Sequence, residues 1–323
     1  MNNLRYLEIL RLNKEFEDNI QNTYNISLLS NVIVHQAKDI IEYLLRDNGI
    51  NANIALGDYD NIAQDSMKQK ETDSVIIFWE LANLVDGLQY KIDLLTNRTI
   101  NEIEQKIRLE IEFVMKNLQR CPLILINKFS SLLFSRPSTT ESKLDKLADR
   151  LNSFLESIIK SNIKLINLDR IIVDIGRGNS FDTRFYYSSK APYTVNFFKS
   201  YANLIKPLVM SAHGMAKKAL IFDCDNTLWK GILGENGING IELSAETKNG
   251  RIFQEIQSIA LSLSQKGVIL GLCSKNNPED VDEVFANHPD MILQDKHITI
   301  KKVNWSDKVL NLKNIAQNLN IGL

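Results

Sequence analysis

Residues 217–235, KKALIFDCDNTLWKGILGE, decide the fold of the second part of the chain. Residues 219–222 (ALIF) form a short apolar run, which predicts a buried strand. Asp223 and Asp225 follow it directly, before the chain turns at residues 226–228. In open α/β sheets, ligands bind at the carboxyl ends of the strands. We therefore expect both carboxylates at a ligand-binding edge of a parallel sheet.

The spacing of these two aspartates indicates their chemistry. Residues two apart in a strand project to the same face, so Asp223 and Asp225 repel each other unless a cation offsets their charge. Grouped carboxylate oxygens suit Mg²⁺, which we predict as the cofactor, with Asp223 and Asp225 as its ligands. A carboxylate beside this ion can attack phosphorus while its neighbour exchanges protons with the leaving group.

The same segment resembles the D-x-D-x-T signature of the haloacid dehalogenase (HAD) superfamily. A bare D-x-D pair is weak evidence, but the strand before it and Thr227 after it make the pattern specific. The resemblance implies that Asp223 is the phosphoryl-accepting nucleophile and Asp225 the general acid and base. It also implies that Thr227 orients the phosphate.

The HAD pattern continues with a second strand that ends in Ser or Thr. Residues 268–276, VILGLCSKN, supply this strand, with Ser274 at its tip. A hydroxyl there can donate to a phosphoryl oxygen, together with main-chain N–H groups of the next helix. A lone serine at a strand end is usually a turn residue, and it is the position of Ser274 after the D-x-D that favours a functional role.

The pattern then requires a Lys or Arg beside the nucleophile. Residues 303–316, VNWSDKVLNLKNIA, offer Lys308 just inside a helix that Ser306 can cap. A cation there would balance charge on the phosphoryl oxygens. An isolated helix lysine is normally a solvated surface residue, whereas the context Asn304-Trp305-x-x-Lys308 favours a place in the site.

Length and composition limit the classes of protein to which the chain can belong. The 323 residues suffice for two domains, and 44% hydrophobic with 24% charged residues is typical of a globular protein. The net charge of −1 gives no electrostatic case for nucleic-acid binding. Three scattered cysteines indicate neither a disulfide framework nor a zinc site. The charged N-terminus and the absence of a membrane-length apolar run lead us to expect a cytoplasmic protein without membrane contact.

Strands alternating with helices organise the first part of the chain. We expect a helix within residues 1–20, strands at 25–31, 53–56, 74–81, 122–128 and 164–169, and helices at 36–48, 101–120, 140–160 and 194–211. This alternation predicts a parallel, flavodoxin-like sheet. The second part adds strands at 219–222 and 268–274 and helices at 250–265, 278–287 and from about 306.

Four motifs sharpen the HAD resemblance to one branch. Residues 223–237, 272–276, 286–293 and 303–308 look like the FkbH-like branch (subfamily IIIC), in the same order. Segments 27–31, 57–61, 78–84 and 185–194 also resemble the SGNH-hydrolase-like domain that precedes the phosphatase-like module in that branch. The resemblance implies an α/β chain with a flavodoxin-like or SGNH-like domain at 1–214 and a HAD Rossmann-like domain at 215–323.

Membership of this branch would imply a reaction. FkbH-like proteins are linked to taking the glyceryl group of an acyl phosphate, removing phosphate and loading the unit on an acyl carrier protein, which would then be a partner. Such a transfer needs a thiol relay. Cys273 is the cysteine placed for it, near a helix N-terminus and Lys275, which are conditions that lower a thiol pKa. Alternatively, Cys273 is a strand residue that points into the core.

The end of the sequence departs from the family pattern. The family continues past NLNIGL into a strand ending in paired acidic residues that complete the metal site. Without them, Mg²⁺ would keep Asp223, the main-chain carbonyl of Asp225 and waters. We therefore expect a fragment of a longer protein, with a further C-terminal domain, and weak Mg²⁺ binding with little turnover for residues 1–323.

The first domain departs from the SGNH pattern as well. His35 is its only histidine before the linker, and where an Asp-x-x-His would fall the sequence has Asp182-Thr183-Arg184-Phe185. Without a base, Ser30 stays a weak nucleophile. We expect a non-hydrolytic binding or docking module. The candidates to line its cleft, which are equally well explained as turn and cap residues, are Ser30, Asn31, Asn83 and Arg184.

Three functions remain open from the sequence. The first is transfer of a phosphorylated acyl unit with loss of phosphate, and the second is hydrolysis of a small sugar or nucleotide-sugar phosphate. The third is an interaction module with a non-catalytic HAD scaffold, against which the intact Asp223, Ser274 and Lys308 argue. The segment between Leu228 and Arg251 is too short for a large cap domain, so the sequence does not define the substrate.

Overall fold

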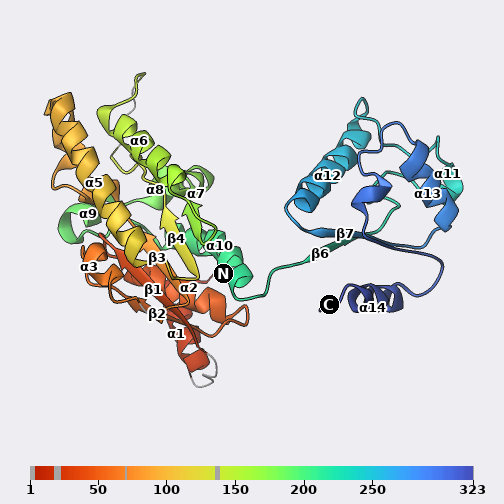
Figure 1. Cartoon of the computed structure of the whole chain (residues 1–323), viewed down its shortest axis with the longest axis horizontal. Helices are drawn as coiled ribbons and strands as arrows, with labels where there is room; N and C mark the ends of the chain where they lie inside the picture. Colours follow the sequence, from red (N-terminus) through yellow and green to blue (C-terminus); the bar gives the residue numbers. More distant parts are fainter. Residues whose placement is uncertain (1–3, 18–22, 70, 135–138, 323) are drawn as a thin grey trace. The chain divides into compact units, whose positions relative to one another are not determined.

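The chain forms two compact units, residues 1–216 and 217–323 (Figure 1). The computed structural model describes residues 4–17, 23–69, 71–134 and 139–322. Both units combine a parallel sheet with helices that connect its strands. The structure thus has the α/β class that the sequence predicts.

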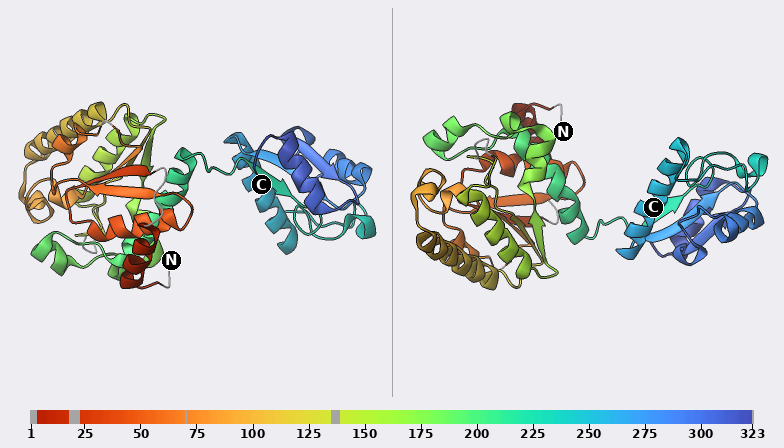
Figure 2. Two further views of the ribbon diagram at one scale, coloured as in Figure 1. Left: turned by 90° about the horizontal axis from the view of Figure 1, so that it is seen from below. Right: turned by 90° about the horizontal axis from the view of Figure 1, so that it is seen from above.

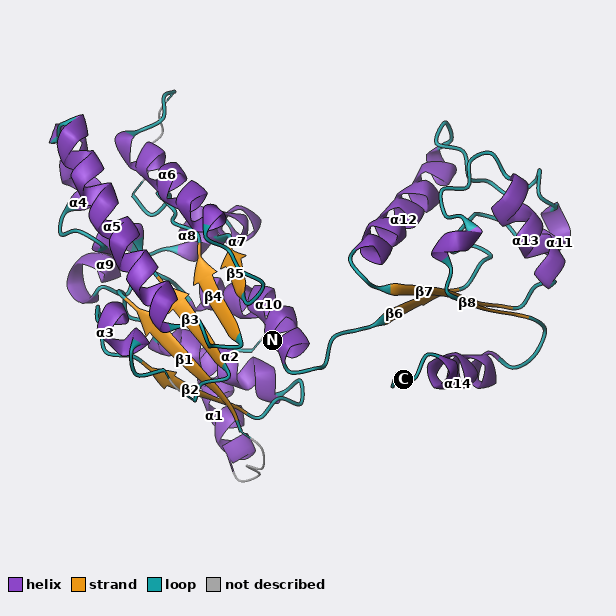
Figure 3. Ribbon diagram, in the orientation of Figure 1, coloured by secondary structure: helices purple, strands orange, loops and turns teal. Residues whose placement is uncertain are grey.

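The first unit is built on a five-stranded parallel sheet (Figure 3). Its strands are β1 (Tyr24–Ser30), β2 (Ala52–Leu56), β3 (Ser74–Phe78), β4 (Leu123–Asn127) and β5 (Ile163–Ile166). They lie side by side in the order β2-β1-β3-β4-β5. This is the flavodoxin-like order, in which the chain reverses direction across the sheet at β1 and β3. The carboxyl ends of β1 and β3 therefore meet at the position where such sheets carry ligands.

The helices of the first unit cover both faces of this sheet (Figure 2). They are α1 (Tyr6–Glu17), α2 (His35–Arg46), α3 (Ile62–Ser66), α4 (Leu88–Lys91), α5 (Asn97–Asn117), α6 (Lys143–Ser157), α7 (Leu168–Ile175), α8 (Arg177–Ser180), α9 (Thr183–Ser189) and α10 (Val195–Ala212). Two 3₁₀ turns, η1 (Leu81–Asn83) and η2 (Ile92–Leu94), join them.

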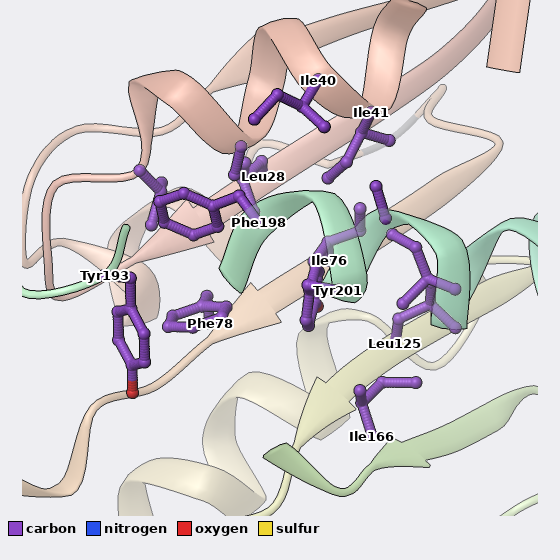
Figure 4. Packing of buried hydrophobic residues seen from close by; sticks show 14 of the residues in the cluster. Leu28, Ile40, Ile41, Ile76, Phe78, Leu125, Ile166, Tyr193, Phe198 and Tyr201 are labelled. Carbon is purple, nitrogen blue, oxygen red and sulfur yellow. The ribbon is translucent and has the colours of Figure 1, made fainter. Parts of the chain in front are cut away.

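Alternating side chains of the strands build two cores. Leu28, Ile76 and Phe78 belong to the core under α2 and α10, which Figure 4 shows around Phe198 and Tyr201. The neighbouring positions on the same strands, including Val75 and Ile77, belong to the core under α5 and α6. Because both faces are covered, β3 is apolar along its whole length, as parallel strands usually are.

The predicted strand at 74–81 is three residues too long. β3 ends at Phe78, and the side chain of Glu80 accepts a hydrogen bond from Ala82 N at 3.1 Å, which caps the turn η1. The helices α7, α8 and α9 were not predicted. They are short, and Gly176 separates α7 from α8 with a positive φ of 82°.

The second unit contains a three-stranded parallel sheet among its described residues. Its strands are β6 (Ala219–Phe222), β7 (Ile269–Ser274) and β8 (Ile300–Val303), in that order. Its helices are α11 (Leu233–Asn236), α12 (Lys248–Gln265), α13 (Pro278–Asn287) and α14 (Lys308–Asn318), with a 3₁₀ turn η3 (Asp295–His297). Neighbouring parallel strands bring the residues that follow β6, β7 and β8 to one edge.

The helix α14 begins one residue later than the sequence predicts. The N-cap of α14 is Asp307, whose side chain accepts from Leu310 N at 2.9 Å, so the prediction of Ser306 as N-cap is wrong by one residue. The shift places Lys308 at the first position of the helix.

Within the described part of the chain, no helix is both long and apolar enough to cross a membrane.

Candidate functional site

Asp223 is the centre of a polar site at the carboxyl edge of the second sheet. It follows β6, while Ser274 ends β7 and Lys308 begins the helix after β8. Ser274 Oγ donates to Asp223 Oδ1 at 2.7 Å, and Lys308 Nζ donates to Asp223 Oδ2 at 2.5 Å. The main-chain N–H of Cys224 also donates to Oδ1, at 2.9 Å. Residues from the ends of three strands thus meet at one carboxylate, and the first and last of them lie 85 positions apart in the sequence.

Hydrogen bonding keeps this carboxylate ionised. Partial burial alone would raise the pKa of Asp223, but the hydrogen bonds from Lys308, Ser274 and Cys224 N, with the charge of Lys308, lower the pKa below its ordinary value. The side chains of Asp223 and Lys308 remain 38% and 39% exposed. The site therefore presents an anionic oxygen and a cation together at the surface, as a nucleophile facing a phosphoryl group requires.

Asp225 is oriented by the loop that follows it. Its Oδ1 accepts from Trp229 Nε1 at 3.0 Å and from Leu233 N at 3.1 Å. Its Oδ2 accepts from Asn276 Nδ2 at 3.0 Å. Both oxygens are thus held by donors of the protein, and the carboxylate ties residues 229–233 to the sheet edge.

The sequence did not indicate two of these partners. Asn276 is buried and bridges the site, because its Nδ2 also donates to Ser274 Oγ at 3.0 Å. Trp229 is fully buried, and its indole N–H positions Asp225. Gln257 of α12 holds the same loop through Leu228 O at 2.8 Å. The contacts of Asn276 with Asp225 and of Gln257 with Leu228 join residues 51 and 29 positions apart, so no local pattern marks them.

Thr227 lies in the turn that follows the two aspartates. Its N–H donates to Cys224 O at 3.1 Å, which tightens the turn, and Asn226 adopts a left-handed φ of 54°. Its hydroxyl makes no hydrogen bond to Asp223 or Asp225 among the described contacts. The structure thus places Thr227 beside the site without joining it to either carboxylate.

Cys273 does not have the environment expected of a reactive thiol. Its side chain is 5% exposed, and its Sγ lies 3.9 Å from Lys308 O. Burial raises the pKa of Cys273, and this outweighs the lowering effect of the Lys308 charge. The expectation of a lowered pKa is therefore wrong, because the helix and lysine charges act on a thiol that is removed from water.

Three of the candidate residues of the first unit form one hydrogen-bonded cluster, in which Ser30 and Asn31 are buried and Asn83 is partly exposed. Ser30 Oγ donates to Phe78 O at 3.0 Å. Asn31 exchanges two hydrogen bonds with the main chain of Glu80, at 2.7 and 2.9 Å, and Asn83 Nδ2 donates to Asn31 O at 2.5 Å. These contacts tie the end of β1 to the end of β3.

Arg184, the fourth candidate, lies apart from this cluster. Its guanidinium pairs with Asp182, Nη2 to Oδ2, at 2.7 Å, and its side chain is 87% exposed. No contact of Arg184 with Ser30, Asn31 or Asn83 occurs in the described part of the structure. The structure therefore brings three of the four residues together and leaves Arg184 at the surface.

Glu80 is a buried carboxyl that the sequence did not single out. Its Oε2 accepts from Tyr193 Oη at 2.5 Å and its Oε1 from Ala82 N at 3.1 Å. Burial raises the pKa of Glu80 to about 7, although both hydrogen bonds act in the opposite direction. Because Glu80 lies in the predicted strand at 74–81, the sequence indicated no special role for it. Tyr193, its hydrogen-bond partner, comes 113 positions later in the sequence, so only the fold shows this contact.

The donor set at the second sheet fits a metal ion held by one carboxylate. Among the described residues, no group of three or more His, Cys, Asp and Glu side chains is placed to hold a metal. Asp223 and Asp225 each accept three hydrogen bonds through their side-chain oxygens, so hydrogen bonding does not distinguish them as ligands, and the main-chain carbonyl of Asp225 remains the expected second ligand. The side chain of Asp223 is 38% exposed, so a metal ion can reach it. Mg²⁺ commonly binds one or two carboxylates and keeps several waters.

One comparison with a solved structure bears on the fold. No family model and no curated protein matches the chain. The chain is similar to the crystal structure of the N-terminal part of the protein BF1531 from Bacteroides fragilis, which contains a phosphatase domain and is complexed with Mg. The TM-score is 0.80 at 21% identity, over 99% of this chain and 86% of that one. The two chains therefore share the α/β architecture of both units.

Two other solved structures show weaker likeness. The lipase Lip_vut3 from a goat rumen metagenome matches with a TM-score of 0.42 at 11% identity, over 60% of this chain and 98% of that one. The salicylyl-acyltransferase SsfX3 from a tetracycline biosynthetic pathway matches with a TM-score of 0.36 at 10% identity, over 61% and 56%.

Proposed function

We propose that the second unit is a Mg²⁺-dependent phosphatase of the HAD type, acting on a small phosphorylated substrate through an aspartyl-phosphate. One observation carries this proposal: Ser274 and Lys308 converge on Asp223 from separate strand ends. The fold likeness to a structure with a phosphatase domain and Mg supports it.

Each residue of the site has a role in this reaction. Asp223 Oδ2 attacks phosphorus, and the bond from phosphorus to the leaving oxygen breaks. Asp225 donates a proton to the leaving oxygen. It later takes a proton from the water that attacks phosphorus, as the bond from phosphorus to Asp223 breaks and phosphate is released. Lys308 and Ser274 face the phosphoryl oxygens, where charge develops. Mg²⁺, held by Asp223 and the main-chain carbonyl of Asp225, would supply further neutralisation of the phosphate charge.

Hydrolysis is favoured over transfer through a thiol. A relay through Cys273 needs a thiolate that reaches the substrate, whereas this side chain is buried and burial raises its pKa. Loading of an acyl carrier protein, as the FkbH-like resemblance implies, would therefore need an acceptor thiol outside this site. We assign the first unit a binding or docking role, because Ser30 Oγ donates a hydrogen bond to Phe78 O and no histidine or carboxylate contacts it among the described residues.

The test is phosphate release from a panel of sugar phosphates, nucleotide-sugar precursors and acyl phosphates, with Mg²⁺ or with EDTA. We expect slow Mg²⁺-dependent release of phosphate that Asp223→Asn reduces to the background rate, because the nucleophile is lost while the fold is kept. Absence of release from every substrate, or an Asp223→Asn variant as active as the wild type, contradicts the proposal. The best substrate then separates acyl phosphates from sugar phosphates.

A further inference from the structure

A cavity in the first unit has the properties of an anion-binding site. It opens between α5 and α6, which pack side by side on the same core (Figure 1). Its volume is about 440 Å³, within the range of small-molecule sites, about 300–1,000 Å³. The described residues that line it are Asn97, Ile100, Asn101, Lys143, Lys146 and Arg150.

Three cations on α6 face this cavity. Lys143, Lys146 and Arg150 are spaced by three and four residues, so they share one side of the helix. Lys143 Nζ is fixed by the main-chain oxygens of Asp93 at 3.0 Å and Leu95 at 2.8 Å. Lys146 is exposed and makes no ion pair within the described residues. No carboxylate is among the described lining residues.

The neighbouring ion pairs carry a net positive charge. Glu104 accepts from Arg150 Nε at 2.5 Å and from Arg108 Nη2 at 2.5 Å, so one buried carboxylate faces two guanidinium groups. Arg150 Nη2 is buried and has no hydrogen-bond partner in the described part of the structure. Buried donors are normally satisfied by protein, water or an ion.

The first turn of α5 adds donors at the same place. Thr96 caps this helix by accepting from Thr99 N at 3.2 Å. The side-chain amides of Asn97 and Asn101 lie one turn apart on the cavity wall. The positive end of a helix dipole and amide donors both favour an anion.

We propose that this cavity binds the phosphate group of a small phosphorylated molecule. The cations of α6 and the first turn of α5 would hold the phosphate oxygens. The volume leaves room for an organic group against Ile100. The proposal concerns a site in the first unit and does not depend on the phosphatase assigned to the second.

The test is calorimetric titration of the whole chain with inorganic phosphate and with phenyl phosphate, in EDTA, at an ionic strength held constant with chloride. We expect saturable binding of both, which Lys146→Ala weakens about tenfold through loss of one charge-assisted hydrogen bond. Lys146 is exposed, so the fold should be kept. Lys106→Ala, an exposed lysine of α5 outside the cavity, is the matched control and should bind as the wild type does.

Four results would count against the proposal. One is the absence of saturable binding at constant ionic strength. Another is equal weakening by Lys146→Ala and Lys106→Ala, which would indicate general charge attraction. The third is loss of binding in Lys308→Ala while Lys146→Ala binds normally, which would assign the phosphate to the second unit. Tighter binding of hexaglutamate than of phosphate would also count against it, in favour of an acidic protein surface.

Discussion

The two parallel sheets place polar residues at their carboxyl edges but use them differently. In the first unit, Ser30 and Asn31 are buried and hydrogen-bond to the main chain at the end of β3. In the second unit, Asp223 and Lys308 keep more than a third of their side-chain surface exposed. The same strand-end position thus stabilises loops in one sheet and presents reactive groups in the other. Accessibility and opposite charge, more than position in the fold, distinguish a chemical site.

Lys308→Ala is the variant expected to have the largest effect on this comparison. It removes the cation that faces Asp223 Oδ2 at 2.5 Å. We expect phosphate release to fall about 100- to 1,000-fold, as for loss of a donor that stabilises transition-state charge. Lys313→Ala, an exposed lysine of the same helix, should keep the wild-type rate. Similar rates for both variants would mean that Lys308 is an ordinary surface residue.

Asn31→Ala tests the structural side of the comparison. The change leaves two main-chain groups of Glu80 without their partners, each at a cost of about 2 kcal/mol. We expect the free energy of unfolding of the first unit to fall by about 4 kcal/mol in urea titrations. The exposed Asn53→Ala should cost less than about 1 kcal/mol. A stable Asn31→Ala protein would argue for a binding role of this residue instead.

Glu80→Gln tests the same edge through pH. Burial raises the pKa of Glu80 from 4.5 to about 7. Because the folded-state pKa is the higher one, the stability contributed by the protonated form is fully present below about pH 4.5 and is lost as the pH rises through about 7.

Glutamine keeps the neutral shape at every pH. We therefore expect Glu80→Gln to unfold with a free energy about 3 kcal/mol higher than the wild type at pH 8, and with a shrinking difference toward pH 4.5. Urea titrations across this range measure it. Glu112→Gln, at an exposed position of α5, should follow the wild type. A constant difference at all pH values would show that charge on Glu80 is not the cause.

Cys273→Ala should have the smallest effect on catalysis. Because the thiol is buried and its pKa is raised, we expect phosphate release within about threefold of the wild type. Rates of release and melting temperatures, measured together, separate a catalytic loss from unfolding. A loss of activity above about tenfold in a folded variant would restore the thiol relay.

The sequence predicted those parts of the molecule that follow local patterns. Apolar runs marked β1, β3, β4 and β7, and the D-x-D-x-T spacing placed Asp223 at a strand end next to Ser274. The sequence did not predict contacts between segments that are far apart in the chain. Asn276 reaches Asp225 across 51 residues, and Tyr193 reaches Glu80 across 113. The pKa of Cys273 was misjudged for a related reason, since sequence shows neighbouring charges but not burial.

The most direct test of the account is to locate the phosphoryl group during turnover. The protein would be mixed with Mg²⁺ and its best substrate, quenched in acid within the first turnover, and digested for mass spectrometry. We expect a phosphate adduct on the peptide that contains Asp223, and no adduct in Asp223→Asn. Turnover with the adduct on another residue, or rapid turnover in Asp223→Asn, would contradict it.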